Sequence, residues 1–304
     1  FNSIDRFHIN RCPFGLLRNA EIPRFLQTLV LAETSDPTKL AALRLVESTL
    51  YANPLNYFRL QTVALPSALF AEFARFSPRL RDMLISFVIY LSRCQRTVSF
   101  VELAQLASNF TPAAITRDTS LLAPYDFIVT QLIMDSPRYQ AILTEARMTM
   151  HVTQAFIHFA AQEAPAPIIA QLLHTLTTLV AKCEPNITLL RETTAVAAAI
   201  ALFKCNVPLR AQLESFFLAV MDVFDLETAQ TTLHRLVEPL DAEPSPLTLL
   251  HTLATLLPLN GIVRDAFRLV GGFDLVQRFY RLWGWSLDAP EGEPSDERLE
   301  IVQA

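Results

Sequence analysis

Apolar residues recur along this chain at intervals of three, four and seven residues, the spacing that lines one side of an α-helix. One such stripe runs through Ile22, Phe25, Leu26, Leu29 and Val30, and others begin at positions 80 and 209. Strands would need apolar residues at every second position instead. Only 6 of the 304 residues are glycine, so the tight turns of β-hairpins are scarce as well. The sequence therefore predicts an all-α protein.

Proline residues mark where the helices begin. The chain has 19 prolines, and many follow a short polar residue, as in Ser77-Pro78 and Ser136-Pro137. The polar side chain can cap the free amides of a helix start, where proline is tolerated because its missing N–H is not needed. These boundaries divide the chain into about 12 to 14 helices of roughly 10 to 20 residues each.

A Gly-Gly pair near the C-terminal end indicates how two of these helices meet. Asn260-Gly261 caps a helix that starts at Ile262, and the pair Gly271-Gly272 ends it, because glycine readily adopts the left-handed conformation of a helix stop. A second apolar stripe follows from Phe273. At least one of the two glycines should therefore have a positive φ angle.

This junction resembles the helix connections of armadillo repeats. Two spacings between helix starts, 41 residues from Pro37 to Pro78 and 48 from Pro137 to Pro185, lie near the period of armadillo and HEAT repeats, whereas others do not. The resemblance implies an armadillo/HEAT-like α-solenoid with irregular repeats, formed by residues 1–287 as one domain. The alternative is an ordinary helix–turn–helix within an α-bundle.

A second resemblance concerns the connector Asn53-Pro-Leu-Asn-Tyr-Phe-Arg-Leu60. It is similar to connectors in the armadillo-like N-terminal regions of BEACH-domain scaffold proteins, the neurobeachin group. Gly-Gly-Phe after a basic helix is also common there. That resemblance implies a large cytosolic scaffold in vesicle trafficking or autophagy. Since the chain begins at Phe1 rather than Met, we expect it to be one segment of a longer protein.

The charge of the chain is concentrated at its C-terminal end. The formal net charge is −5, and residues 288–304 alone contain six acidic residues and one arginine. Residues 1–287 are thus close to neutral and lack the basic excess typical of nucleic-acid binding. Pro290, Gly292 and Pro294 interrupt helix formation, so we expect residues 288–304 to form an acidic, flexible tail.

No motif in the sequence indicates a reaction. The six histidines and four cysteines lack metal-ligand spacing, and no phosphate-binding glycine loop or nucleophile elbow occurs. We therefore expect no enzyme activity, no cofactor and no metal site. The cysteines lie far apart, which is typical of reduced thiols, and the longest apolar run, 195–203, is too short to cross a bilayer. The expected location is the cytoplasm, with at most peripheral membrane contact.

These features favour a non-catalytic scaffold that binds other proteins or neighbouring domains. The alternative is a peripheral membrane or lipid-binding helical module, which would use exposed Phe or Trp side chains near arginine. Trp283 and Trp285 either cap the end of the hydrophobic core or dock a neighbouring domain. An arginine cluster is the other candidate partner site, unless it is only a solvated helix end; it comprises Arg79, Arg81, Arg93 and Arg96.

Overall fold

The computed structural model describes residues 15–17, 19, 21–32, 35–95, 98–205, 207–237 and 246–282. Throughout these ranges the regular structure is helical, without a strand. The prediction of an all-α protein is therefore confirmed. Residues 288–304, predicted to be a flexible tail, lie outside the described residues.

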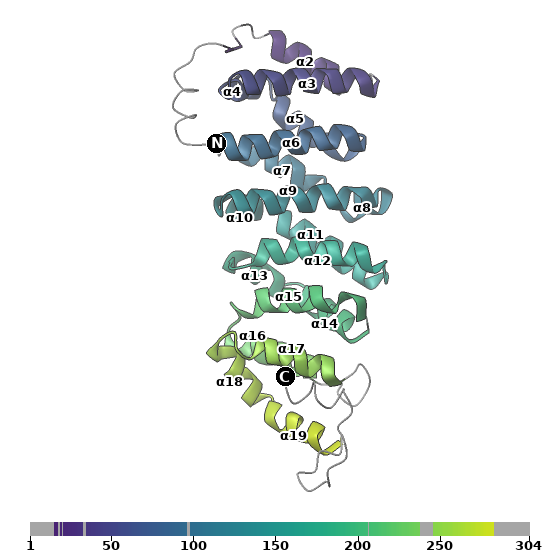
Figure 1. The fold of residues 1–304 in the computed structure, drawn as a ribbon, viewed down its shortest axis with the longest axis vertical. Coiled ribbons are helices and arrows are strands. Elements are labelled where there is room, and N and C mark those ends of the chain that lie inside the picture. Colours follow the sequence, from purple (N-terminus) through teal and green to yellow (C-terminus); the bar gives the residue numbers. More distant parts are fainter. Residues whose placement is uncertain are drawn as a thin grey trace, which may run out of the picture. The chain divides into compact units, whose positions relative to one another are not determined.

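The chain divides into two compact units, Phe1–His158 and Phe159–Ala304. The prediction of one domain over residues 1–287 stays a prediction. The helices of the first unit, labelled as in Figure 1, are α2 (Glu21–Leu31), α3 (Asp36–Ala52), α4 (Asn56–Gln61), α5 (Leu65–Ala71), α6 (Pro78–Gln95), α7 (Phe100–Ser108), α8 (Pro112–Arg117), α9 (Leu122–Asp135), α10 (Arg138–Glu145) and most of α11 (Met148–Ala161), with the 3-10 turns η1 (Phe73–Arg75) and η2 (Thr119–Leu121).

Two rows of helices form the first unit. Helices α3, α6 and α9 lie side by side in one row, because α6 contacts both of the others (Figure 1). In the second row α5 contacts both α2 and α7. Aromatic side chains fill the space inside: Phe73 and Phe110 each meet the ring of Tyr125 edge to face, and all three are fully buried.

The second unit also pairs helices that are not consecutive in sequence. Helix α15 contacts α12 and α17, and α16 contacts α14 and α18. The helices of this unit are α12 (Ala166–Val180), α13 (Glu184–Arg191), α14 (Ala195–Cys205), α15 (Arg210–Met221), α16 (Leu226–Val237), α17 (Pro246–Leu256), α18 (Gly261–Leu269) and α19 (Gly272–Leu282), with the 3-10 turn η3 (Val207–Leu209).

The helix count exceeds the predicted 12 to 14, since the described residues already form eighteen α-helices. The difference comes from short helices that the apolar period does not reveal. Helices α4 and α8 have six residues each, fewer than two turns, so each buries too few side chains to show a stripe. The prediction of the count was therefore wrong, although the type of structure was right.

Asparagine side chains tie the helix ends together. Each amide group donates to backbone carbonyl groups, most of which belong to the last turn of another helix or to the residue that follows it. Asn109 bonds the carbonyls of Phe70 and Ala71 at the end of α5, and Asn260 bonds those of Met221 and Asp222 at the end of α15. Both asparagines thus reach 38 and 39 residues back along the chain. Asn56 bonds the carbonyls of Gly15 and Thr49, and Asn186 that of Leu179.

The Gly-Gly junction forms as the sequence predicts. The side chain of Asn260 accepts a hydrogen bond from the Val263 amide at the start of α18, and Gly271 has a φ angle of +73°. Gly272 is needed for a different reason: a Cβ atom there would lie 2.3 Å from the ring of Phe267. Phe273, expected on the apolar face of the second helix, is 64% exposed, although its ring meets that of Phe267 edge to face with the ring centres 5.7 Å apart.

Candidate functional site

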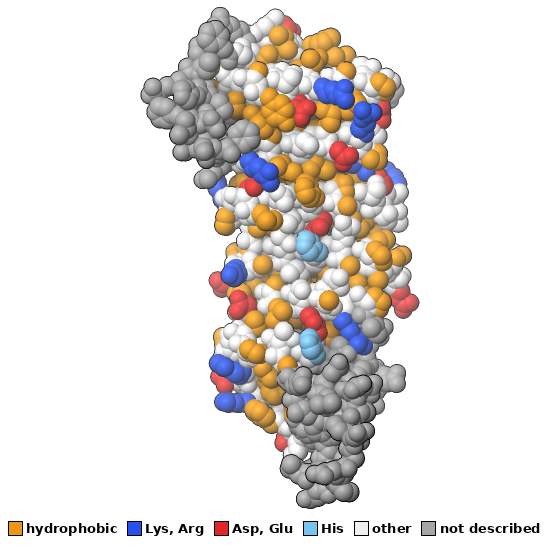
Figure 2. Space-filling model, viewed as in Figure 1, with side chains coloured by type: hydrophobic (Ala, Val, Ile, Leu, Met, Phe, Trp, Pro, Cys, Tyr) orange, Lys and Arg blue, Asp and Glu red, His pale blue; other side chains and the backbone are white. Residues whose placement is uncertain are grey.

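The exposed face of α3, α6 and α9 is the candidate interaction site in the first unit. Figure 2 shows hydrophobic side chains mixed with Lys and Arg on this face. Each helix buries one side against the second row and leaves a stripe of side chains in solvent. The stripe on α3 is mostly apolar, the stripe on α6 is mostly polar, and the stripe on α9 is again mostly apolar.

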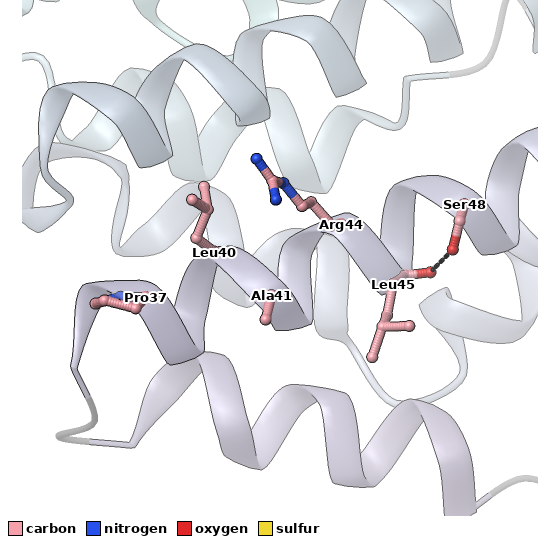
Figure 3. A pocket seen from close by; sticks show the side chains of 6 residues that line it. All are labelled: Pro37, Leu40, Ala41, Arg44, Leu45 and Ser48. Atoms are coloured by element: carbon pink, nitrogen blue, oxygen red, sulfur yellow. Dashed lines mark hydrogen bonds between the residues drawn. The ribbon is translucent and has the colours of Figure 1, made fainter.

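An open groove of about 630 Å³ follows the exposed stripe of α3. Leu45 is 54% exposed, and its neighbour Ala41 leaves a low point between larger side chains. In Figure 3, Leu40 and Arg44 point to one edge of the helix, while Ala41 and Leu45 point to the other. Its described lining residues are Pro37, Leu40, Ala41, Arg44, Leu45 and Ser48.

The α9 stripe exposes two large apolar side chains two turns apart. Phe127 is 48% exposed and Met134 is 72% exposed. Single apolar residues at a surface are ordinary, but an aromatic ring and a thioether on one stripe are the side-chain types enriched at binding surfaces. The α9 stripe therefore belongs to the candidate surface.

Helix α6 carries three of the four arginines predicted to bind a partner, but they do not form one patch. Arg79 is exposed at the start of the helix, where its side chain contacts no charged group in the described part of the chain. Arg93, near the other end, is 55% exposed and bonds Asp135 at 3.4 Å and Gln131 at 2.8 Å on α9. The backbone positions of Arg79 and Arg93 are about 21 Å apart along the helix axis.

Arg81 is buried inside the first unit, with only 5% of its surface exposed. Its guanidinium donates to the Asp118 carboxylate at 2.7 Å, the Ser120 hydroxyl at 3.1 Å and the Ala74 carbonyl at 3.2 Å. Hydrogen bonds from Ser120 and Arg81 lower the pKa of Asp118, which keeps the carboxylate ionised. The structure therefore places Arg81 in a tie between α6 and the start of η2, away from the exposed stripe.

Arg96, Trp283 and Trp285 lie outside the described residues. Their assignment to partner binding stays a prediction.

A buried carboxylate, Glu102, lies at the start of α7. It completes a capping box with Ser99 and accepts hydrogen bonds from the Tyr57 hydroxyl at 2.5 Å and the Gln61 amide at 3.3 Å. Burial raises the pKa of Glu102 despite these bonds, and it also raises the pKa of Tyr57. Glu102 is 1% exposed, so this cluster joins α4 to α7 and offers no access to a substrate.

Among the residues that the structure describes, no group of three or more His, Cys, Asp or Glu side chains is placed to hold a metal ion. Over the same residues no single helix is long and apolar enough to cross a membrane; α13 and α14 meet that test only as a pair bent by 78°.

Comparisons with protein-family models, curated proteins and solved structures find no significant match to this chain.

Sequence reasoning did not find the α3 groove, although a signal was present. In α3 the residues Leu43, Val46 and Leu50 form the buried stripe. Leu40, Ala41 and Leu45 then form a second apolar set on another side of the same helix. A helix with one apolar stripe needs one partner, whereas apolar residues on two sides indicate a second contact.

Proposed function

We propose that this chain is a non-catalytic scaffold that binds other proteins through the exposed face of α3, α6 and α9. The observation that carries the proposal is the pair of apolar stripes on this face. Leu45 on α3 and Phe127 and Met134 on α9 are large side chains that are 54%, 48% and 72% exposed. Protein interfaces have an apolar centre and a polar rim, and α6 contributes Arg79 and Arg93 between the two stripes.

We further propose an armadillo/HEAT-like α-solenoid as the architecture. Contacts between helices three apart in sequence support it: α3 with α6, α6 with α9, and α12 with α15. The asparagine ties at 38 and 39 residues support a repeat of similar length. A stacked array of this kind offers a long surface for partners.

The polar groups inside the units support a structural role rather than catalysis. Arg81, Glu102 and the helix-end asparagines are committed to hydrogen bonds that hold helices together. Catalytic groups need access to a substrate as well as a perturbed pKa. The buried Glu102 lacks that access.

The assignment to vesicle trafficking or autophagy remains a prediction from the resemblance to BEACH-domain scaffolds. The connector that carries this resemblance has a folding role here. Asn53 accepts a hydrogen bond from the Leu55 amide, and Asn56 bonds Gly15, Leu17 and Thr49. The cytoplasmic location likewise remains a prediction.

Site-directed photo-crosslinking tests the scaffold proposal. A benzoylphenylalanine at position 127 should form a crosslink to a defined protein in an extract of the source cells, and the same group at the exposed position Thr116 on α8 should not. Equal crosslinking at both positions would contradict a specific face. Co-sedimentation with liposomes tests the alternative: binding that Phe127→Asp abolishes would favour a lipid-binding module, whereas a protein scaffold stays in the supernatant.

A further inference from the structure

The lining of the α3 groove has the spacing of a helix-binding surface. In knobs-into-holes packing, one side chain of a partner helix enters a hole formed by residues i, i+3, i+4 and i+7 of the facing helix. Pro37, Leu40, Ala41 and Arg44 make one such hole. The next hole begins at Ala41 and is completed by Arg44, Leu45 and Ser48. All six described lining residues thus belong to these two successive holes.

A helix suits this groove better than an extended peptide does. The backbone of α3 is paired within the helix from Asp36 to Ala52, so it offers no row of free amides to a strand. Binding energy must then come from side chains. From position 37 to position 48 the groove is about 17 Å long, which matches three turns of a partner helix.

The charge of the groove points to an acidic partner. Among the described lining residues Arg44 carries the charge, and its side chain forms no ion pair or hydrogen bond with any described residue. It also borders both holes, so a carboxylate beside the inserted side chains could pair with it. Arginine favours such paired carboxylate contacts at interfaces.

A second copy of this chain would not satisfy Arg44 through the same groove. Two α3 helices packed face to face and antiparallel would place Arg44 near Ala41 of the other copy. None of the described lining residues is acidic. The two guanidinium groups would then be brought together and partly desolvated without a carboxylate, which is unfavourable.

We propose that the α3 groove binds an amphipathic α-helix of another protein, which inserts apolar side chains into the two holes and presents an acidic residue to Arg44. The proposal rests on the scaffold function above and names its partner class. It requires only the first unit's α3, not the stripes on α6 and α9.

A displayed library of helical peptides provides the test. The probe is an 18-residue helix with Leu, Ile, Phe or Ala at one stripe and either Glu or Lys at the flanking positions. It is selected on the whole 304-residue chain, and the affinity of each enriched peptide is then measured against the single variants. We expect enriched peptides to carry Glu rather than Lys. Each peptide should bind the Leu45→Asp and Arg44→Glu variants at least about tenfold more weakly than the wild type. The first variant places a charge in an apolar hole, and the second removes the charge partner of the peptide's Glu. A Glu-to-Lys version should regain affinity for Arg44→Glu.

Met134→Asp on α9 is the matched control, because it places the same charge on another exposed apolar position and should leave peptide affinity unchanged. Peptides sensitive to Met134→Asp instead, or indifferent to charge, would overturn the groove proposal and leave the scaffold proposal standing. So would a failure to enrich any helix while crosslinks at position 127 persist. Dimerisation of the wild-type chain that Leu45→Asp abolishes would identify a second copy as the occupant and overturn the proposal too.

Discussion

Replacing either glycine of the α18–α19 junction should destabilise the second unit, but for different reasons. Gly271 has a φ angle of +73°, and a Cβ atom there would meet nothing closer than the Asp274 carboxylate at 3.7 Å. Gly272 has ordinary helical backbone, but its Cβ atom would lie 2.3 Å from two ring atoms of Phe267. Backbone conformation therefore restricts which residue can occupy position 271, and the lack of space restricts which can occupy position 272.

The expected magnitudes follow from these two limits. Alanine at position 271 must hold a left-handed conformation, which costs roughly 1–2 kcal/mol of unfolding free energy. Asparagine tolerates that conformation, so Gly271→Asn should cost less than Gly271→Ala. At position 272 the ring of Phe267 must retreat by about 1 Å or more to reach normal contact distance. Phe267 is 3% exposed, and such overpacking costs about 1–3 kcal/mol, more for asparagine than for alanine.

Asparagine should therefore destabilise the protein less than alanine does at position 271, but more than alanine does at position 272. Urea and thermal denaturation, followed by circular dichroism, measure the four variants beside the wild type. Each kcal/mol should shift the melting temperature by about 2–4 °C for a cooperative unit of this size. Phe267→Leu removes the ring, so Gly272→Ala should cost clearly less in that background, with a coupling energy of about 0.5–3 kcal/mol.

Two results would refute this reasoning. One is an equal loss for alanine and asparagine at both positions. The other is a Gly272→Ala loss that the Phe267→Leu background leaves unchanged, because the cost could not then come from contact with that ring.

Three further predictions concern the buried polar groups of the first unit. Burial raises the pKa of Glu102 above 4.5, so the folded state keeps a proton that the unfolded state has released. The free energy of unfolding, measured with urea, should therefore fall as the pH rises from 4.5 through the raised pKa. The Glu102→Gln variant should lack this pH dependence. Asp118→Ala should cost about 1–3 kcal/mol, since it leaves the buried Arg81 without its carboxylate, whereas Arg81→Met should cost less because Asp118 is partly solvated; chemical denaturation compares them. Asn56→Asp should lower the melting temperature more than Asn56→Ala, because it turns a carboxylate oxygen toward two carbonyl oxygens.

Local patterns in the sequence were sufficient to predict the helices and their ends. The capping role of Asn260 and the positive φ of Gly271 depend on residues within a few positions, and the structure has both. The role of Arg81 depends on Asp118, 37 residues away, so its position in the sequence gave no sign that it would be buried. Arg79, two residues earlier, has the same local pattern and remains exposed.

The candidate surface shows the same limit. The period of α3 predicts a helix, but it does not say which of two apolar sides will meet the second row. Contacts of α3 with α2 and α6 decide that Val46 is buried and that Leu45 is exposed. Surface sites on a helix therefore follow from the neighbours, which the sequence alone does not provide.

The asparagine ties also limit how the length of this chain can change in evolution. Asn109 reaches the carbonyl of Ala71 across 38 residues that include α6 and α7. An insertion in an exposed connection within that span adds only a small loop entropy and leaves the bond possible. One residue added inside α6 would instead turn the rest of the helix by about 100° and advance it by about 1.5 Å, so Asn109 would miss the end of α5. Relatives of this chain should therefore differ in length at the connections and keep the helices between two tied positions constant.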